Sequence, residues 1–494
     1  MGITSHLPIL QVVVPLIAAP LMVVLRRGVL AWLLAVAVSW SALAVAAALF
    51  LEVAGGGFVS YWIGSWPPPY GIEYRIDIVN AFLALLVSLI ASVVIVYSKA
   101  SVDAEIAHER HYLFYAMYSL CLAGLLGITV TGDAFNLFVF LEISSLSSYV
   151  LIALGRDRRA LMASYQYLIL GTIGATCYII GVGLIYLETG TLNLADIASR
   201  LPLVTDSRPV LAALAFITVG ISLKLALFPL HLWLPNAYAY APSVVTAFLA
   251  ATATKVSIYV LLRYYFTVFG GSAIFDHEPM APIWIVLSLA AIFIASTVAI
   301  FQENVKRMFA YSSVAQIGYI TLGVSLGSMT GLTAGIVHLF NHALTKGALF
   351  LFLGGIAMRV GTIRFGSIAG IGKVMPLTSF GIVLAGLSLI GVPATVGFVS
   401  KWYLVARALE RGDWWLAFAV VGSSLLTVIY VWRFVEVAYF REPTTEVARL
   451  REAPLSMLAP AWLLVIACIY FGLDTHLTVG GAAAAAQELL RGRL

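Results

Sequence analysis

The feature that most constrains this chain is a series of apolar runs, each about as long as the 20 residues that a helix needs to cross a bilayer core. Composition agrees, since 62% of the 494 residues are hydrophobic and only 10% are charged. A soluble domain has about a quarter charged residues. A chain with so little charge cannot cover its own surface with polar groups, so its outside must face lipid.

Counting these runs predicts an all-α integral membrane protein with about fourteen transmembrane helices. The predicted spans are 8–25, 29–51, 77–97, 111–130, 133–154, 162–187, 209–229, 243–266, 281–301, 304–326, 329–358, 376–399, 414–438 and 453–472. The longest loops between them, 52–76 and 188–208, are too short for a soluble domain. The first run lacks an A-x-A cleavage site and is therefore expected to be a span, not a removed signal.

Composition also excludes several classes of function. The net charge of +5 is spread over loops, and the longest basic run, Arg156 to Arg159, is interrupted by Asp157, so nucleic acid is not an expected partner. The three cysteines, Cys121, Cys177 and Cys468, lie far apart. Without a C-x-x-C pair, iron–sulfur clusters and structural zinc are excluded. We find no cofactor-binding motif and expect no cofactor.

The distribution of lysine and arginine predicts the orientation, because cytoplasmic loops are enriched in both. Fifteen follow odd-numbered spans: Arg26, Arg27, Lys99, Arg110, Arg156, Arg158, Arg159, Lys306, Arg307, Arg359, Arg364, Lys373, Arg441, Arg449 and Arg451. Six follow even-numbered internal spans: Arg75, Arg200, Arg208, Arg263, Arg407 and Arg411. The odd loops are therefore expected in the cytoplasm and both termini outside, as a multi-pass protein of a bacterial inner (plasma) membrane.

Two predicted spans are interrupted by proline. Pro229 follows Lys224 in the seventh span, and Pro393 precedes Lys401 in the twelfth. Proline removes a backbone donor, which is tolerated inside a membrane only against protein or a wet cavity. Broken helices at matching positions in two halves point to a transport site. The spacing suggests two repeats, spans four to eight and nine to thirteen; incidental kinks are the alternative.

Ionisable residues inside the predicted spans indicate an ion path, because a charge at the bilayer centre costs at least about 2.5–3.5 kcal/mol. Glu142 lies about 13–14 Å into the fifth span, too deep for a short side chain to reach the surface. It is the candidate partner of Lys224. A lysine that a movable carboxylate pairs and releases can act as a proton switch. A static ion pair is the alternative.

Further basic residues extend this series. Lys255 lies about 18 Å along the eighth span. His338, His342 and Lys346 occupy one face of the eleventh span, at i, i+4 and i+8, which is typical of a proton path. Zinc would need a third ligand, which is not evident, so no metal is expected.

Three other positions at span ends complete the series. Lys401 is the predicted final relay toward the outer face. Lys306 fits either a cytoplasmic anchor or a site of proton uptake, and Asp133 is predicted to cap a helix.

These segments together resemble the antiporter-like family shared by Mrp-type Na⁺/H⁺ antiporters and respiratory complex I. The segments that carry the resemblance are Phe140–Glu142, Leu223–Pro235, Lys255 with Tyr259, Lys306–Tyr319 and His338–Lys346. The similarity runs from about residue 75 to 440. The segment Thr189–Ala198 and a lysine at 401 favour the branch of the Mrp D subunit over that of the complex I M subunit. One departure is Pro235-Asn236, where many members have Pro-Asp.

The resemblance implies fourteen helices, two inverted five-helix repeats and breaks in helices seven and twelve. Residues 1–110 would hold the first three helices, 111–266 the first repeat, 281–440 the second, and 453–494 the last helix and a tail. It also implies the glutamate–lysine pair in helices five and seven, the central lysine of helix eight and the final relay of helix twelve. Glu142, Lys224, Lys255 and Lys401 occupy those positions.

The expected function is proton translocation within a multisubunit monovalent cation/proton antiporter, carried by Glu142, Lys224, Lys255, His338, His342, Lys346 and Lys401. Its expected partners are other membrane subunits, protons and Na⁺ or K⁺. The chain itself is expected to be a secondary ion transporter subunit and not an enzyme. The main alternative is a proton-pumping subunit of a redox complex, such as NADH–quinone oxidoreductase or a membrane-bound hydrogenase. An independent solute carrier is less favoured, because nothing indicates a pocket for an organic substrate.

Overall fold

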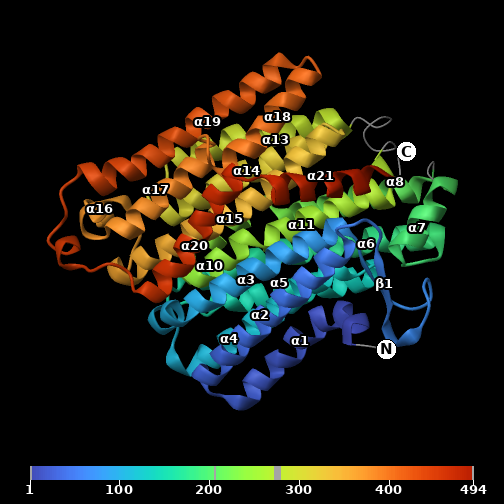
Figure 1. Ribbon diagram of the computed structural model, residues 1–494, viewed down its shortest axis with the longest axis horizontal. Coiled ribbons are helices and arrows are strands. Elements are labelled where there is room, and N and C mark those ends of the chain that lie inside the picture. The colour runs from blue at the N-terminus through green and yellow to red at the C-terminus, as the bar shows by residue number, and fades with distance from the viewer. Residues whose placement is uncertain (1–2, 205–206, 272–279, 492–494) are drawn as a thin grey trace.

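The computed structural model describes residues 3–204, 207–271 and 280–491. Long helices run side by side in a single bundle (Figure 1). They extend from α1 and α2 along one side to α19 along the other, and the C-terminal helix α21 lies across the middle. The start of α1, the strand β1, the short helix α7 and the end of α21 all lie at the same end of the bundle.

The elements follow one another in this order. The first half contains α1 (Leu7–Leu25), α2 (Gly28–Val53), β1 (Val59–Trp62), β2 (Glu73–Ile76), α3 (Ile78–Glu105), α4 (His111–Val130), α5 (Ala134–Ala153), α6 (Arg159–Thr189), α7 (Leu194–Arg200), α8 (Arg208–Leu225), α9 (Trp233–Tyr240), α10 (Ser243–Ala251), α11 (Ala253–Leu262) and the π-helical turn η5 (Arg263–Val268). The second half contains α13 (Met280–Ile300), α14 (Val305–Ser325), α15 (Met329–Val360), α16 (Ile371–Val374), α17 (Pro376–Ile390), α18 (Val396–Glu410), α19 (Trp414–Val435), α20 (Leu455–Leu473) and α21 (His476–Leu490).

Twelve helices of the described residues are long and apolar enough to cross a membrane, or thirteen if the bent pair Phe365–Val374 and Pro376–Ile390 is one span. The remaining predicted spans, 304–326 and 376–399, correspond to α14 and to the broken pair α17–α18. α14 carries polar residues along its length, and α17 has only 15 residues. The all-helical membrane fold expected from the apolar runs is thus confirmed.

Three segments contain structure that the apolar runs did not predict. The loop 52–76 holds the antiparallel hairpin β1–β2, in which Ser60 lies opposite Arg75. The loop 188–208 holds α7. The predicted tail after α20 forms α21, which buries Thr478, Ala482, Ala485, Ala486 and Leu489. That spacing is a helical stripe, but small residues gave it too little hydrophobicity to be counted as a span.

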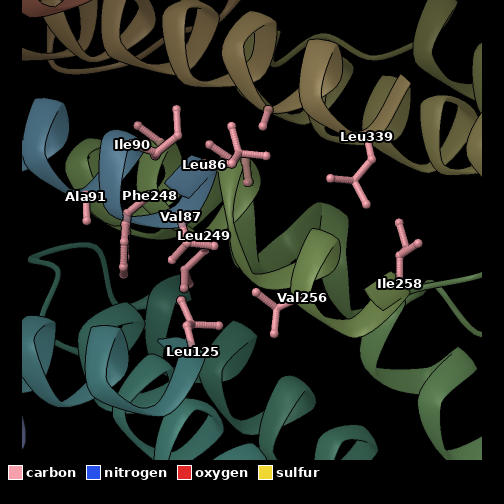
Figure 2. Packing of buried hydrophobic residues seen from close by; sticks show 14 of the residues in the cluster. Leu86, Val87, Ile90, Ala91, Leu125, Phe248, Leu249, Val256, Ile258 and Leu339 are labelled. Carbon is pink, nitrogen blue, oxygen red and sulfur yellow. The ribbon is translucent and has the colours of Figure 1, made fainter. Parts of the chain in front are cut away.

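The centre of the bundle is α15. Every residue from Gly331 to Ile356 in this helix is buried. A helix buried on all sides must be surrounded by others, and α3, α10, α14, α17, α18, α20 and α21 pack around it. Figure 2 shows part of this core, where Leu86 and Ile90 of α3 gather with Phe248 of α10, and Leu339 of α15 lies farther along, beyond Val256 of α11. The predicted His338–Lys346 face therefore lies in the middle of the protein.

The seventh span is held against its neighbour by glycine. A Cβ at Gly220 of α8 would lie 2.6 Å from the carbonyl oxygen of Gly174 in α6 and 2.8 Å from the backbone nitrogen of Tyr178. Real Cβ atoms do not approach backbone so closely, so the two helices touch only because both positions lack a side chain. This contact lies one turn before Lys224 and helps to place that lysine.

We predict that Gly220→Val destabilises the folded protein by about 1–3 kcal/mol, because the added atoms force α6 and α8 apart. Thermal unfolding in detergent measures the effect. Gly183→Val on α6 is the matched control, since a Cβ there would meet nothing within 4 Å. Equal unfolding temperatures for the two variants would contradict the close helix contact.

Candidate functional site: a buried row of ionisable groups

Glu142 and Lys224 form the ion pair expected from the sequence. The Lys224 ammonium lies 3.1 Å from a carboxylate oxygen of Glu142 and donates a second hydrogen bond, of 2.7 Å, to Ser145 Oγ. The two side chains differ in exposure, 3% for Lys224 and 25% for Glu142. On α5 the exposed residues Val139 and Leu146 flank Glu142. The carboxylate therefore joins the buried lysine to the outer surface of the bundle.

Lys224 occupies the last turn of α8, directly before the first break. Ala226 adopts a left-handed conformation (φ 59°), and the helix resumes only at Trp233 as α9. The indole nitrogen of Trp233 donates 2.9 Å to the carbonyl of Leu223, which fixes the two halves against each other. The predicted break around Pro229 is confirmed. A cation at a helix C-terminus is stabilised by the helix dipole as well as by Glu142.

Lys255 lies at a third break, which the sequence did not predict. α10 ends at Ala251, Thr252 leaves helical geometry (φ −124°, ψ −59°), and α11 begins at Ala253. The interruption frees the carbonyl of Ala250, which accepts a 2.5 Å hydrogen bond from Lys255 Nζ. The side chain is fully buried. Neither glycine nor proline marks this position, so only the neighbouring threonines could have indicated it.

The predicted face of α15 is formed as expected. His338 is hydrogen-bonded by one ring nitrogen to Ser400 Oγ at 2.7 Å and by the other to Gln316 Oε1 at 2.9 Å. The ring of His342 follows at 6.3 Å between centroids, and neither of its nitrogens has a hydrogen-bond partner among the described residues. Lys255 and Lys346 both lie within electrostatic range of His342. The histidine face thus connects the two central lysines.

Lys346 ends this face of α15. Its ammonium donates 2.7 Å to the carbonyl of Phe309 in α14 and also contacts Ser312 Oγ. It is fully buried and has no carboxylate partner among the described residues. A backbone carbonyl and a hydroxyl can accept from an amine in either protonation state, because both states carry N–H donors.

Lys401 lies at the second predicted break. α17 ends at Ile390, Gly391 is left-handed (φ 90°), and α18 begins at Val396. Lys401 Nζ donates to the freed carbonyls of Leu389 and Ile390, at 3.1 and 2.9 Å. It also donates to Ser424 Oγ at 3.0 Å and lies 4.7 Å from the centroid of the Tyr319 ring. The break around Pro393 is confirmed, and it supplies the lysine's acceptors.

Lys306 and Glu105 form a polar cluster at the expected cytoplasmic end. Lys306 Nζ donates 2.8 Å to Ser243 Oγ, and the Ser243 hydroxyl in turn donates 3.1 Å to Glu105. The same carboxylate accepts from the backbone nitrogen of Ser243, at the first residue of α10. A cavity of about 270 Å³, lined in part by Glu105, Arg156 and Asp157, adjoins the cluster. Sequence reasoning missed Glu105, because it stands at the polar end of a span.

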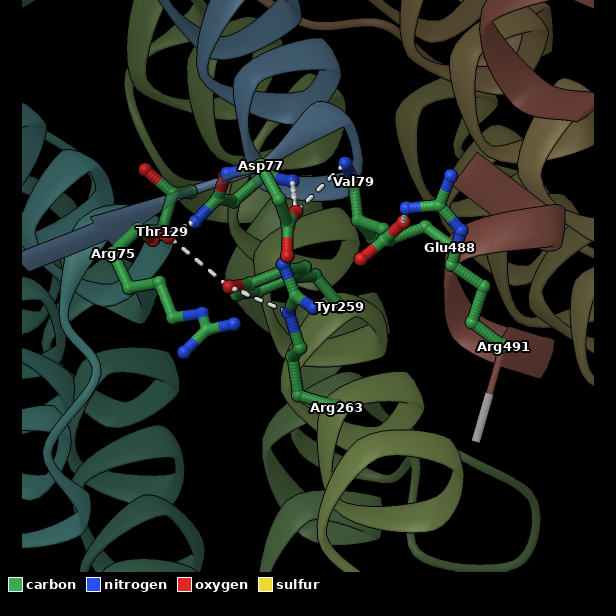
Figure 3. Close-up of polar contacts among 9 residues, drawn as sticks. Arg75, Asp77, Val79, Thr129, Tyr259, Arg263, Glu488 and Arg491 are labelled. Atoms are coloured by element: carbon green, nitrogen blue, oxygen red, sulfur yellow. Dashed lines mark hydrogen bonds and ion pairs between the residues drawn. The ribbon is translucent and has the colours of Figure 1, made fainter. Parts of the chain in front are cut away.

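A cluster that sequence reasoning missed lies at the C-terminal end of α11 (Figure 3), whereas the Lys306 cluster lies at the start of α10. Arg263 Nη2 pairs with Asp77, and its Nε donates 3.1 Å to the hydroxyl of Tyr259. That hydroxyl donates 3.0 Å to the carbonyl of Thr129. From the sequence, Arg263 was expected in an outer loop, whereas its side chain is only 10% exposed. The continuation of α11 into the π-helical turn η5 brings Arg263 into the bundle, two turns after Lys255.

One smaller expectation concerns the start of α5. Asp133 caps α5, as predicted, by accepting 2.7 Å from the backbone nitrogen of Asn136. The described ranges contain no group of three His, Cys, Asp or Glu side chains that could hold a metal ion.

The fold and the site together define a class: polytopic helical membrane proteins with an interior row of ionisable side chains placed at helix breaks. Residues 131–427 match the family model described as NADH:quinone oxidoreductase/Mrp antiporter, TM. The chain belongs to this family, which confirms the resemblance seen in the sequence.

The family has relatives of two kinds. The chain is 44% identical to the N subunit of NADH-quinone oxidoreductase from Desulforudis audaxviator, covering 95% of this chain and 96% of the relative. It is 30% identical to the D subunit of the Na(+)/H(+) antiporter from Alkalihalophilus pseudofirmus, covering 86% and 85%. A chain in the structure of the Mrp complex from Dietzia sp. DQ12-45-1b superposes with a TM-score of 0.91 at 29% identity, covering 99% and 98%.

We predict that Glu142→Leu destabilises the protein by up to about 3 kcal/mol, because it leaves Lys224 buried without its carboxylate. The double variant Glu142→Leu/Lys224→Met should recover most of this loss, since an apolar pair of similar size avoids an unpaired charge. Thermal unfolding of both variants in detergent tests this. A double variant no more stable than Glu142→Leu alone would show that the pair is not the cause.

Proposed function

We propose that this chain is the proton-translocating subunit of a multisubunit monovalent cation/proton antiporter. The observation that carries the proposal is the buried Glu142–Lys224 pair at the head of a row of basic side chains, each at a helix break or on the central face of α15. Titratable groups inside a membrane mark proton paths. The relatives named as Na(+)/H(+) antiporter subunits make Na⁺ the expected exchanged cation, with K⁺ as the alternative.

The mechanism depends on the contrast between Lys224 and the other lysines. Lys224 has a carboxylate partner, whereas Lys255, Lys346 and Lys401 donate to backbone carbonyls and hydroxyls. Acceptors of that kind suit both protonation states. Ammonium groups in one buried row repel one another, so a proton gained at one end favours release at the other. Separation of Glu142 from Lys224 would release the proton of Lys224 and start this sequence.

The path runs laterally through the middle of the bundle. From Lys224 the proton passes to Lys255, then along His338 and His342, with Lys346 beside them, and reaches Lys401. The 2.7 Å hydrogen bond between His338 and Ser400, the residue directly before Lys401 on α18, supports the last step of this order. The ring nitrogens of His342 have no hydrogen-bond partner in the part of the chain that the structure describes, which leaves this histidine able to take a proton or a bridging water. The cluster of Lys306, Ser243 and Glu105, with its adjoining cavity, is the proposed point of uptake from the cytoplasm.

Coupling to the rest of the complex would act through Glu142. Its partial exposure on α5 lets a group from a neighbouring subunit attract or repel the carboxylate and so alter the contact with Lys224.

We further propose that residues 111–266 and 281–440 are the two inverted repeats. Each contains one of the predicted broken spans, α8–α9 or α17–α18. The membrane is proposed to be the bacterial inner membrane, with the odd-numbered loops in the cytoplasm.

A redox-driven proton pump is the second candidate. The observation that favours it is the 44% identity to a subunit of NADH-quinone oxidoreductase, which exceeds the 30% identity to the antiporter subunit. The row of ionisable groups would serve either driving force. Purification of the complex under mild conditions decides between them. Iron–sulfur or nickel subunits in the complex would favour the redox enzyme, and small hydrophobic subunits alone would favour the antiporter.

Glu142→Ala and Lys224→Ala should each abolish Na⁺-dependent collapse of ΔpH in everted membrane vesicles, with the complex still assembled. The physical reason is that either change removes the switch at the head of the row. Glu446→Ala and Lys373→Ala are matched controls, because they remove the same charges from exposed cytoplasmic positions. Normal exchange in either site variant would reject the pair as part of the proton path.

Lys401→Ala should reduce proton flux through the complex to near background, because it removes the last group of the row. Arg411→Ala, an exposed cation after the same helix, is expected to retain wild-type flux. Passive proton flux in proteoliposomes under an imposed membrane potential provides the measurement for both. Wild-type flux in Lys401→Ala would remove this lysine from the path and leave the Glu142–Lys224 proposal intact.

A further inference from the structure

A large polar cavity lies away from the row, at the predicted cytoplasmic ends of the first four helices. Its volume is about 810 Å³, within the range of small-molecule binding pockets. Its walls come from the α1–α2 turn, the end of α3, the start of α4 and the loop after α5. The basic residues that line it are Arg26, Arg27, Lys99 and Arg156, and the aromatic residues are Trp32, Tyr112 and Tyr115.

The charges in this cavity are not balanced by the protein. Its two carboxylates belong to Asp103, which lies 3.5 Å from His111, and to Glu109. Arg26, Arg27 and Lys99 form no ion pair with a carboxylate of the described residues. At the same predicted membrane face, Arg159, Lys373 and Arg441 each pair with an acid within 2.9 Å. Convergence of unpaired cations from separate helices creates a site for an anion.

The backbone holds these groups in place. Arg26 takes the left-handed conformation (φ 51°) at the tight turn between α1 and α2, which presents Arg26 and Arg27 side by side. Gly28 allows that turn to approach α4, since a Cβ there would lie 3.0 Å from Cβ of His111. Lys99 lies 4.9 Å from the centroid of the Trp32 ring, and the Trp32 indole donates 3.1 Å to the carbonyl of Ile95. The aromatic ring thus orients the lysine.

Apolar side chains indicate what kind of anion fits. Val29 and Leu30 line the cavity, and Val24, Leu25, Val29 and Leu30 are exposed on the adjoining surface of α1 and α2, by 78%, 43%, 59% and 40%. A free anion would gain nothing from such a surface. A phospholipid places its phosphate at this depth and its acyl chains against the apolar surface. Basic pockets between helices at the cytoplasmic side, and tryptophan and tyrosine at the interface, suit this ligand.

We propose that this cavity binds the headgroup of an anionic phospholipid, with its phosphate held by Arg26, Arg27, Lys99 and Arg156 and its acyl chains against α1 and α2. Arg156 also lines the cavity beside Glu105, but the site shares no residue with the row from Glu142 to Lys401 and does not depend on the proposed function. It ties the first two helices, whose apolar faces are the more exposed, to α3 and α4.

The test compares the full chain with Arg26→Gln/Arg27→Gln, purified in mild detergent. Arg449→Gln/Arg451→Gln is the matched control, because it removes two exposed cations from the same predicted face outside the cavity. Lipid mass spectrometry should find about one fewer anionic phospholipid per chain in the cavity variant only. Thermal unfolding should show that added phosphatidylglycerol raises the Tm of the wild type and the control more than that of the cavity variant.

Two further measurements distinguish an anionic phospholipid from a neutral phospholipid and from a free phosphate ester. Phosphatidylcholine, which has no net charge, and glycerol phosphate, which has no acyl chains, should each stabilise the wild type less than phosphatidylglycerol does. Equal stabilisation by either would overturn the proposal, as would equal lipid retention by all variants. Lys99→Gln provides a milder variant if the double substitution folds poorly. It should weaken the response to phosphatidylglycerol, and an unchanged response would count against the site.

Discussion

The arrangement of this protein depends on the cost of burying lysine in a medium that cannot solvate it. Lys224, Lys255, Lys346 and Lys401 all lie inside the bundle, and only Lys224 has a carboxylate partner among the described residues. An unpaired buried charge would be very unfavourable. At Lys255 and Lys401 the acceptors are backbone carbonyls that a helix break has freed. At these two breaks the freed carbonyls accept hydrogen bonds from the lysine, so the lysine and the open carbonyls are satisfied together.

Hydrogen bonds to the freed carbonyls explain why irregular backbone is stable at membrane depth. Carbonyls without partners in lipid would each cost several kcal/mol, so broken helices occur only where protein or water supplies donors. At the breaks beside Lys255 and Lys401 the donor is an ammonium group, and at the break after Lys224 it is the indole of Trp233. Because a carbonyl can accept from a charged or a neutral amine, the same contacts suit both protonation states that the proposed function requires. The pairing with Glu142 differs, since a carboxylate interacts more strongly with a charged than with a neutral lysine. In the proposed function this makes Lys224 the group that an external signal would control.

The rest of the fold positions these breaks around one central helix. α15 is buried on every side and carries His338, His342 and Lys346. His338 is hydrogen-bonded to Ser400 of α18, and Lys346 to the carbonyl of Phe309 in α14. The small residues of α21 and of the α6–α8 contact allow the surrounding helices to approach closely. The polar clusters around Lys306 and around Arg263 lie at either end of this interior. The sequence offered Lys306 as a possible site of proton uptake, but it did not reveal Glu105 or the Arg263 cluster, because their residues stand where ordinary loop charges are expected.

The sequence by itself determined the membrane fold, the two proline breaks and the identity of the interior charges. An apolar run as long as a bilayer is thick predicts a transmembrane helix, and a charged residue in the middle of such a run indicates a functional site. Only the tertiary structure decided which groups meet, namely Glu142 with Lys224 at 3.1 Å and Lys401 with the backbone carbonyls that it donates to. It also decided the helix break at Thr252 and the packing of α21. These depend on contacts between segments far apart in the chain. No local pattern of residues encodes them.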